Sequence, residues 1–210
     1  FTPEQTLDLD PGDMLYLPPR WAHDGVALGA CMTCSIGFRA PAAQELAREL
    51  MHRIADAVGD DARAPALYRD PDQPAVAAPG RIPPQLRVFA RQALAAMQRD
   101  ALALPRALGE VLSEPKPDVW FERASAPRQL KSLVLDRRTR MLYDEHHVFI
   151  NGEAHRMSGQ GAALLRRLAD RRMLGPDDLR GADPALRALL KEWCEAGWLH
   201  PADRAADRAA

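Results

Sequence analysis

The spacing of apolar positions along the chain changes twice, and each change marks a different kind of predicted structure. The first 40 residues hold short β-rich apolar runs separated by turn residues, which predicts strands over residues 5–9, 14–17 and 26–38. Apolar positions then recur every four residues, which predicts a helix that Pro41 opens and Gly59 ends. The apolar face of this helix comprises Leu46, Leu50, Ile54 and Val58.

A proline-rich link over residues 60–84 separates this helix from two further helical patterns. The longer pattern covers residues 85–104 and places its apolar residues on one face. The shorter covers residues 106–113 and ends at the prolines that follow Glu114, because proline cannot continue a helix. The middle of the chain is therefore predicted to be helical.

The last third of the chain mixes short strands with helices. Asn151-Gly152 between two β-rich runs is the strongest hairpin signal, because this pair supplies the two positive φ angles of a type I′ turn. Ser158 and Asp183 are predicted to cap helices, and Gly197 ends the second of these. The remaining predicted elements are strands at 132–135, 141–143 and 198–199 and a helical turn at 177–180. Small strands with three helices and a hairpin are typical of a winged-helix domain.

Composition fits a folded protein with a core, since 47% of the 210 residues are hydrophobic and 27% are charged. The net charge of −1 conceals a gradient: residues 1–40 carry −3, residues 41–124 carry −1 and residues 125–210 carry +3. The acidic first part suits a cationic substrate such as an arginine side chain. The last part lacks the concentrated basic patch of a dedicated nucleic-acid binder, so direct nucleic-acid binding is not expected.

The cysteines favour a reducing compartment. Three cysteines, an odd number, argue against a disulfide framework and predict a cytoplasmic protein. Cys31 and Cys34 have the Cys-x-x-Cys spacing, but on a strand they face opposite sides, which favours two small packed side chains over a zinc or redox pair. No apolar run approaches the roughly 18 residues of a membrane span, so no membrane partner is expected.

Candidate chemistry concentrates between Gly12 and His23. Pro11 and Gly12 form a turn, a short apolar run follows, and Pro18-Pro19 ends the predicted strand because proline cannot donate to a sheet ladder. The chain then presents His23 on a loop at the rim of a sheet, where a metal ligand or a catalytic group is well placed. A hydrogen-bonded rim histidine is the structural alternative.

This motif resembles a known family. Gly12, Pro18, Arg20 and His23 have the spacing of the second cupin motif, in which the histidine is a metal ligand, although Arg20 stands where cupins usually have glycine. The wider pattern around residues 11–25 and 35–41, with the Tyr-x-Asp-Pro-Asp-x-Pro order at 68–74, resembles the JmjC-type ribosomal oxygenases, in particular the bacterial arginine hydroxylases of a large-subunit ribosomal protein. Those are Fe(II)- and 2-oxoglutarate-dependent dioxygenases.

The resemblance implies an iron site for which this sequence supplies only part of the ligand set. Such enzymes hold iron with two histidines and one carboxylate, two of which normally come as His-x-Asp or His-x-Glu from an earlier strand. None of the six histidines here is followed two residues later by Asp or Glu: His23, His52, His146, His147, His155 and His200. We therefore expect the C-terminal part of an oxygenase in which His23 is an iron ligand and the other two ligands lie upstream. These residues alone are expected to be inactive, and none is assigned as catalytic.

Thr33 stands, by its offset from His23, where relatives carry a polar residue near the cosubstrate, so the resemblance implies a contact between Thr33 and 2-oxoglutarate. The bacterial relative carries asparagine there, and a threonine on a strand is also explained by β-propensity. Both interpretations of Thr33 remain open from the sequence.

The overall prediction is an α+β chain in four segments. Residues 1–40 form the C-terminal portion of a JmjC/cupin double-stranded β-helix, residues 41–124 a helical dimerisation domain, residues 125–205 a winged-helix domain and residues 206–210 a tail. The resemblance implies a ribosomal-protein substrate hydroxylated on arginine and a homodimer formed through the helical segment. The target residue and the substrate protein are not set by these residues.

Two other functions are compatible with the sequence. A winged-helix regulator with a cupin part that binds a small molecule would use a basic face comprising Arg166, Arg167, Arg171 and Arg172. A solvated helix face is the alternative for these arginines, because no aromatic residues interleave and Asp170, Asp177 and Asp178 dilute the charge. A structural dimer scaffold would show neither metal nor peptide affinity.

Overall fold

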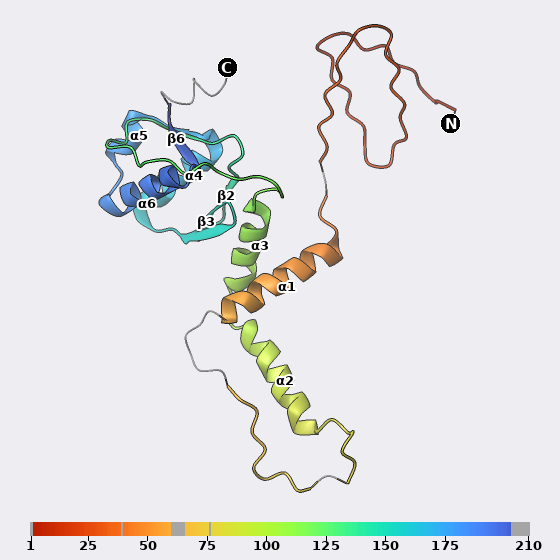
Figure 1. The fold of residues 1–210 in the computed structure, drawn as a ribbon, viewed down its shortest axis with the longest axis vertical. Coiled ribbons are helices and arrows are strands. Elements are labelled where there is room, and N and C mark those ends of the chain that lie inside the picture. Colours follow the sequence, from red (N-terminus) through yellow and green to blue (C-terminus); the bar gives the residue numbers. More distant parts are fainter. Residues whose placement is uncertain (1, 39, 60–65, 76, 203–210) are drawn as a thin grey trace. The chain divides into compact units, whose positions relative to one another are not determined.

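The computed structural model describes residues 2–38, 40–59, 66–75 and 77–202 (Figure 1). The chain divides into two compact units, Phe1–Ala40 and Pro41–Ala210. The first unit carries the cupin-like motif, and the second contains all the helices and strands that the structure assigns among the described residues.

The described residues of the first unit contain neither helix nor strand. Two tight turns organise its backbone, one closed by the Asp13 amide donating to the Asp10 carbonyl at 3.0 Å, the other by the Trp21 amide donating to the Pro18 carbonyl at 3.2 Å. The strands predicted at 5–9, 14–17 and 26–38 are thus not formed in this structure. A strand is stable only when a neighbour pairs with its N–H and C=O groups, and the described residues of this unit supply no such neighbour.

Three helices open the second unit: α1 (Ala43–Gly59), α2 (Pro84–Met97) and α3 (Ala103–Ser113). α1 packs against α3, and Leu46, Leu50 and Ile54 are half-buried on its predicted apolar face. The side chain of Val58, predicted on the same face, lies outside the described residues.

The helix predicted over 85–104 is wrong at its end, because α2 stops at Met97. Asp100 explains the interruption. Its carboxylate accepts a hydrogen bond from the Leu102 amide at 2.9 Å, and its carbonyl accepts one from the Ala103 amide at 3.0 Å. An aspartate that bonds to nearby backbone competes with helix continuation, and the chain starts a new helix, α3, after this turn.

The rest of the second unit contains two three-stranded antiparallel sheets and three more helices (Figure 1). One sheet has the strand order β5 (Met173–Leu174), β1 (Leu133–Leu135), β6 (Leu199–Pro201). The other has the order β2 (Met141–Tyr143), β3 (His147–Ile150), β4 (Glu153–Arg156). The helices are α4 (Gly159–Arg171), α5 (Pro176–Arg180) and α6 (Pro184–Glu195).

Local signals in this region are confirmed where the chemistry is specific. Asn151 has φ 49° and Gly152 has φ 90° between β3 and β4, as a type I′ turn requires. Asp183 caps α6, its carboxylate accepting from the Leu186 amide at 2.7 Å. Ser158 stands at the N-cap of α4, but its side chain makes no capping hydrogen bond. Strand β5 was not predicted, because a two-residue strand carries no periodicity.

The hydrophobic core lies between these sheets and helices. Trp193, Leu190 and Leu168 are at most 1% exposed, and the apolar residues of β1 and β3 join them. Burying a side chain of this size stabilises the fold by about 1.5–3 kcal/mol. The core therefore holds the winged-helix region together through many such contributions.

Two glycines are required by close packing. A Cβ on Gly109 of α3 would lie 2.3 Å from the ring of Phe149 on β3, so the missing side chain lets this helix rest on the sheet. Gly197, with φ +78°, ends α6, and a Cβ there would lie 2.3 Å from the Glu122 carbonyl oxygen. At both positions, the absence of a side chain lets a segment that precedes β1, either α3 or the backbone at Glu122, pack closely against the winged-helix core.

None of the helices among the described residues combines the length and the hydropathy that crossing a bilayer requires.

Candidate functional site

The segment that leads to His23 is shaped by two turns. At the first, Pro11 precedes Gly12, whose φ of +103° is the geometry that favours glycine at the third position of a type II turn. The Asp13 carboxylate also accepts from the Asp10 amide at 2.9 Å, so the turn is closed from both directions. The sequence signal Pro-Gly-Asp thus has a direct structural counterpart.

The second turn positions His23. Arg20, where cupins usually have glycine, adopts a positive φ of 70°, which is the conformation that a glycine would take without strain. Nδ1 of His23 lies 3.3 Å from the Trp21 carbonyl oxygen. Because a carbonyl only accepts, Nδ1 carries the proton in this contact, and Nε2 keeps its lone pair. A neutral imidazole in this tautomer is the form in which histidine binds a metal.

The structure leaves the predicted partners of His23 unassembled. Thr33 is exposed, and no hydrogen bond joins it to His23 within the described residues. Among those residues no group of three or more His, Cys, Asp or Glu side chains could hold a metal ion. Cys31 and Cys34 are free and exposed, so the expectation of two packed small side chains is not met here. The roles of His23 and Thr33 stay predictions.

Two histidines of the winged-helix region, His200 and His155, interact with side chains of the same region. His200 Nε2 lies 2.9 Å from Oδ2 of Asp136, and Arg138 Nε donates to Oδ1 of the same carboxylate at 2.9 Å. Burial alone raises the pKa of Asp136, but the hydrogen bonds from Arg138 and His200 outweigh it and hold that pKa well below its usual range. For His155, burial lowers the pKa, which keeps its ring neutral beside Trp193.

The basic face considered for a winged-helix regulator is mostly engaged within the protein. Arg166 donates to the Glu145 carbonyl at 3.1 Å, and Arg167 forms an ion pair with Asp178. Arg172 turns its guanidinium to the Asp136 carbonyl at 2.8 Å and the Thr139 carbonyl at 3.1 Å. Only Arg171 of the four predicted residues has no such contact among the described residues. Three of these four arginines thus have partners within the protein, so this face offers fewer free donors than the sequence suggested.

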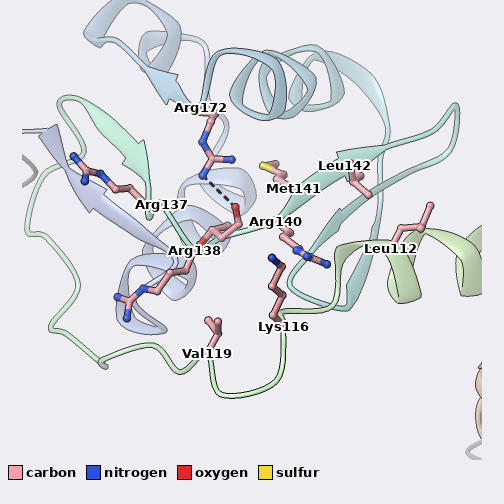
Figure 2. A pocket seen from close by; sticks show the side chains of 10 residues that line it. Leu112, Lys116, Val119, Arg137, Arg138, Arg140, Met141, Leu142 and Arg172 are labelled. Atoms are coloured by element: carbon pink, nitrogen blue, oxygen red, sulfur yellow. Dashed lines mark hydrogen bonds between the residues drawn. The ribbon is translucent and has the colours of Figure 1, made fainter. Parts of the chain in front are cut away.

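The sequence analysis missed a basic pocket that the tertiary structure assembles around the β1–β2 turn (Figure 2). Its volume is about 560 Å³, and its ten lining residues include five cations and no acidic residue. The cations come from three segments: Lys116 after α3, Arg137, Arg138 and Arg140 in the turn, and Arg172 at the end of α4. The run Arg137-Arg138-Thr139-Arg140 is the only local signal that could have indicated it.

Comparison with known proteins agrees with the motif and the fold. The JmjC domain family matches residues 1–46, and the ROXA-like winged helix family matches residues 96–200, half of the chain. The chain is 29% identical over 203 residues to the ribosomal protein uL16 3-hydroxylase of Escherichia coli. It covers 53% of that protein, so it spans about half the length of this relative.

Solved structures of an E. coli protein show the same fold. An X-ray structure of E. coli YcfD matches 79% of this chain and 46% of its own, with 25% identity and a TM-score of 0.60. The structure of YcfD, described as a ribosomal oxygenase, in complex with cobalt and 2-oxoglutarate matches with 24% identity over 79% of this chain and 47% of its own, TM-score 0.60. The motif, the domain matches and the fold agree, and the chain belongs to the ROXA-like winged helix family, with a JmjC domain match at residues 1–46.

Proposed function

We propose that these residues form part of an Fe(II)- and 2-oxoglutarate-dependent dioxygenase that hydroxylates an arginine side chain of a large-subunit ribosomal protein. The observation that carries this proposal is the motif at residues 11–23, which lies inside the JmjC match and ends in His23. The names of the relatives support it: one is a ribosomal protein hydroxylase, and another was solved with cobalt, a common substitute for iron, and 2-oxoglutarate. A ribosomal-protein substrate also fits the cytoplasmic location predicted from the cysteines.

His23 fits the role of one iron ligand. Its Nδ1 donates to the Trp21 carbonyl, which leaves Nε2 available to a metal and fixes the ring tautomer. An iron centre of this class needs a second histidine and a carboxylate on the same face. Within the described residues, no group of three or more His, Cys, Asp or Glu side chains is placed to hold a metal ion.

The residues around His23 suggest how substrate and cosubstrate would be recognised. In the proposed enzyme, Thr33 would contact 2-oxoglutarate, as its offset from His23 implies. Residues 1–40 carry five acidic and two basic side chains, and an excess of carboxylates attracts a guanidinium group. This charge is the feature of the chain that favours arginine as the target.

The test is 2-oxoglutarate turnover by the protein encoded by the complete gene. Succinate formation is measured with and without a ribosomal-protein peptide, and the peptide is examined for the mass gain of one oxygen atom. His23→Ala should lower substrate-dependent turnover by about 100-fold or more, because a lost metal ligand weakens binding more than a lost supporting contact does.

His52→Ala is the matched control, since His52 lies exposed on α1, outside the JmjC match. It should retain the activity of the unmodified protein. Turnover retained by His23→Ala would rule out the ligand role, and an unmodified protein without peptide-dependent turnover would contradict the function itself.

We also propose that residues 41–124 form a homodimer. α2 buries none of its residues, and Leu86, Val88 and Leu94 on it are exposed. An amphipathic helix with no buried face is stabilised when a partner covers its apolar side. Light scattering should give twice the chain mass, and Leu86→Glu together with Leu94→Glu should give a monomer; a monomer before substitution would contradict this proposal.

A further inference from the structure

The β1–β2 turn concentrates positive charge at one place on the winged-helix region. Figure 2 shows Lys116, Arg140 and Arg172 arranged around the turn, with Arg137 and Arg138 extending outward from it. These five cations line the basic pocket of about 560 Å³ together with Leu112, Val119, Met141, Leu142 and Thr139. Bringing five positive charges this close together costs free energy unless an anion neutralises part of that charge.

Two of these five cations are held in place without being neutralised. Arg140 donates to the Glu114 carbonyl at 3.0 Å, and Arg172 donates to the Asp136 and Thr139 carbonyls. A carbonyl oxygen orients a guanidinium but leaves its full charge. Arg138 is different, because the Asp136 carboxylate pairs with it at 2.9 Å.

Two further cations of the pocket are unengaged. Lys116 and Arg137 are exposed, and neither side chain has a hydrogen bond or an ion pair within the part of the chain that the structure describes. Both are long and flexible, so they can close on an anion at little structural cost. The pocket thus joins oriented arginines with adaptable cations.

We propose that this basic pocket binds the phosphodiester backbone of a single-stranded nucleic acid. Arginine forks match phosphate oxygens in two-bonded geometry, and several cations gathered without an opposing carboxylate suit a ligand with repeated charges. This inference does not depend on the proposed hydroxylase activity.

A second basic pocket favours a polymer over a single anion. It has a volume of about 350 Å³, and its charged lining residues are all cations: Arg128, Lys131, Arg187 and Lys191. Residues 128–131 precede β1 and residues 137–140 follow it. Lys131 and Arg137 are six residue steps apart in the sequence, so at most about 20 Å of extended chain separates them, which a strand of several nucleotides can bridge.

The lining also predicts how the nucleic acid would be recognised. Neither pocket is lined by a Phe, Tyr or Trp, so bases have no aromatic side chain on which to stack. Binding through phosphates alone is independent of sequence and weakens steeply with salt. The expected ligand is therefore any single strand, bound through its backbone.

The experiment measures binding of the 210-residue chain to a fluorescein-labelled single-stranded RNA of mixed sequence, about 20 nucleotides long, across a series of salt concentrations. Lys116→Ala combined with Arg137→Ala removes the two unengaged cations without breaking a hydrogen bond of the fold. Affinity should fall by about five- to tenfold, and the slope of log K against log salt should become shallower by about 1.4, or 0.7 per lost phosphate contact.

Arg69→Ala combined with Arg81→Ala is the matched control, with the same change in charge at two exposed positions outside α2. Unchanged affinity in this control supports the proposal, and an equal loss in both double variants overturns it, because net charge alone would then explain binding. A polyglutamate peptide that binds as tightly as the RNA would overturn the phosphate assignment. Complete displacement of the RNA by inorganic phosphate, at an equal concentration of phosphate groups, would show a single-anion site instead.

Discussion

The JmjC-matching unit and the winged-helix region hold their apolar side chains in opposite ways. In Phe1–Ala40, Met32 is 90% exposed and Phe38 is 91% exposed. In the winged-helix region, Leu190 is 0% exposed and Trp193 is 1% exposed. The JmjC-matching motif thus lies in a unit whose described residues form no helix or strand, whereas the buried core lies in the region that matches the ROXA-like winged helix family. Chemistry and folding stability are separable along this chain.

The difference follows from where each region finds its partners. β2, β3 and β4 follow one another within 16 residues, so their pairing closes short loops at low entropic cost. The strands predicted in the first unit belong to a barrel, whose strands pair with distant segments. Within the described residues those segments are not provided, and the β-rich sequence stays unpaired.

Hydrogen exchange should show the largest effect. Amides of residues 5–17 have almost no backbone partners, so they should exchange at nearly the rate of an unstructured peptide. Amides of α6 around Leu190 should be slower by several orders of magnitude, because they open only with the core. Mass spectrometry of peptic peptides measures both; equal protection in the two regions would mean that the predicted strands are paired in solution.

Gly109→Ala tests whether α3 belongs to the winged-helix core. In an open helix this change stabilises by about 0.5–1 kcal/mol. Here the new Cβ meets the Phe149 ring at 2.3 Å, so the free energy of unfolding should fall by about 2 kcal/mol. Urea denaturation measures it.

Gly161→Ala in α4 is the control for that change. Its Cβ would lie 3.6 Å from Leu186 Cδ2, an ordinary contact, so this variant should be neutral or slightly more stable. If both alanines stabilised the protein, α3 would not rest on β3 in solution.

The lowered pKa of Asp136, which lies in the second unit, predicts that the stability of this unit depends on pH. Its pKa is held well below the usual value by hydrogen bonds from Arg138 and His200, so its contribution is present above about pH 4 and declines as pH falls further. Asp136→Asn should lower the free energy of unfolding by about 2 kcal/mol at neutral pH, and by less at pH 3. Asp177→Asn, at an exposed ion pair, should change it by less than about 0.5 kcal/mol. A loss for Asp136→Asn that did not shrink in acid would point to packing instead.

His23→Ala should have the smallest effect on folding. His23 is exposed, and within the described residues its side chain hydrogen-bonds only the nearby Trp21 carbonyl, so the free energy of unfolding of the second unit should change by less than about 0.5 kcal/mol. Thermal unfolding of the 210-residue chain measures it. If stability is unchanged while the complete protein loses activity, His23 serves the chemistry and not the fold. A clear destabilisation would show that His23 also supports the fold.

Sequence reasoning was reliable where a few neighbouring residues decide the outcome. Asn151-Gly152 predicted its turn and Asp183 its cap. It failed at Asp100, whose side chain interrupts the long predicted helix, and at β5, which exists only because β1 lies beside it. For the candidate site it indicated His23 and Thr33, and the described residues bring no metal centre together around them.

What the sequence determined by itself is the family and the order of the segments, since both depend on residues close together: the motif that ends in His23 and the hairpin at Asn151-Gly152. What only the tertiary structure decided is which charges are available. It gave Arg166, Arg167 and Arg172 hydrogen-bond or ion-pair partners within the protein, and it gathered Lys116 with the arginines of the β1–β2 turn. The physical reason is that charge acts through space, over distances that the order of residues in the chain does not specify.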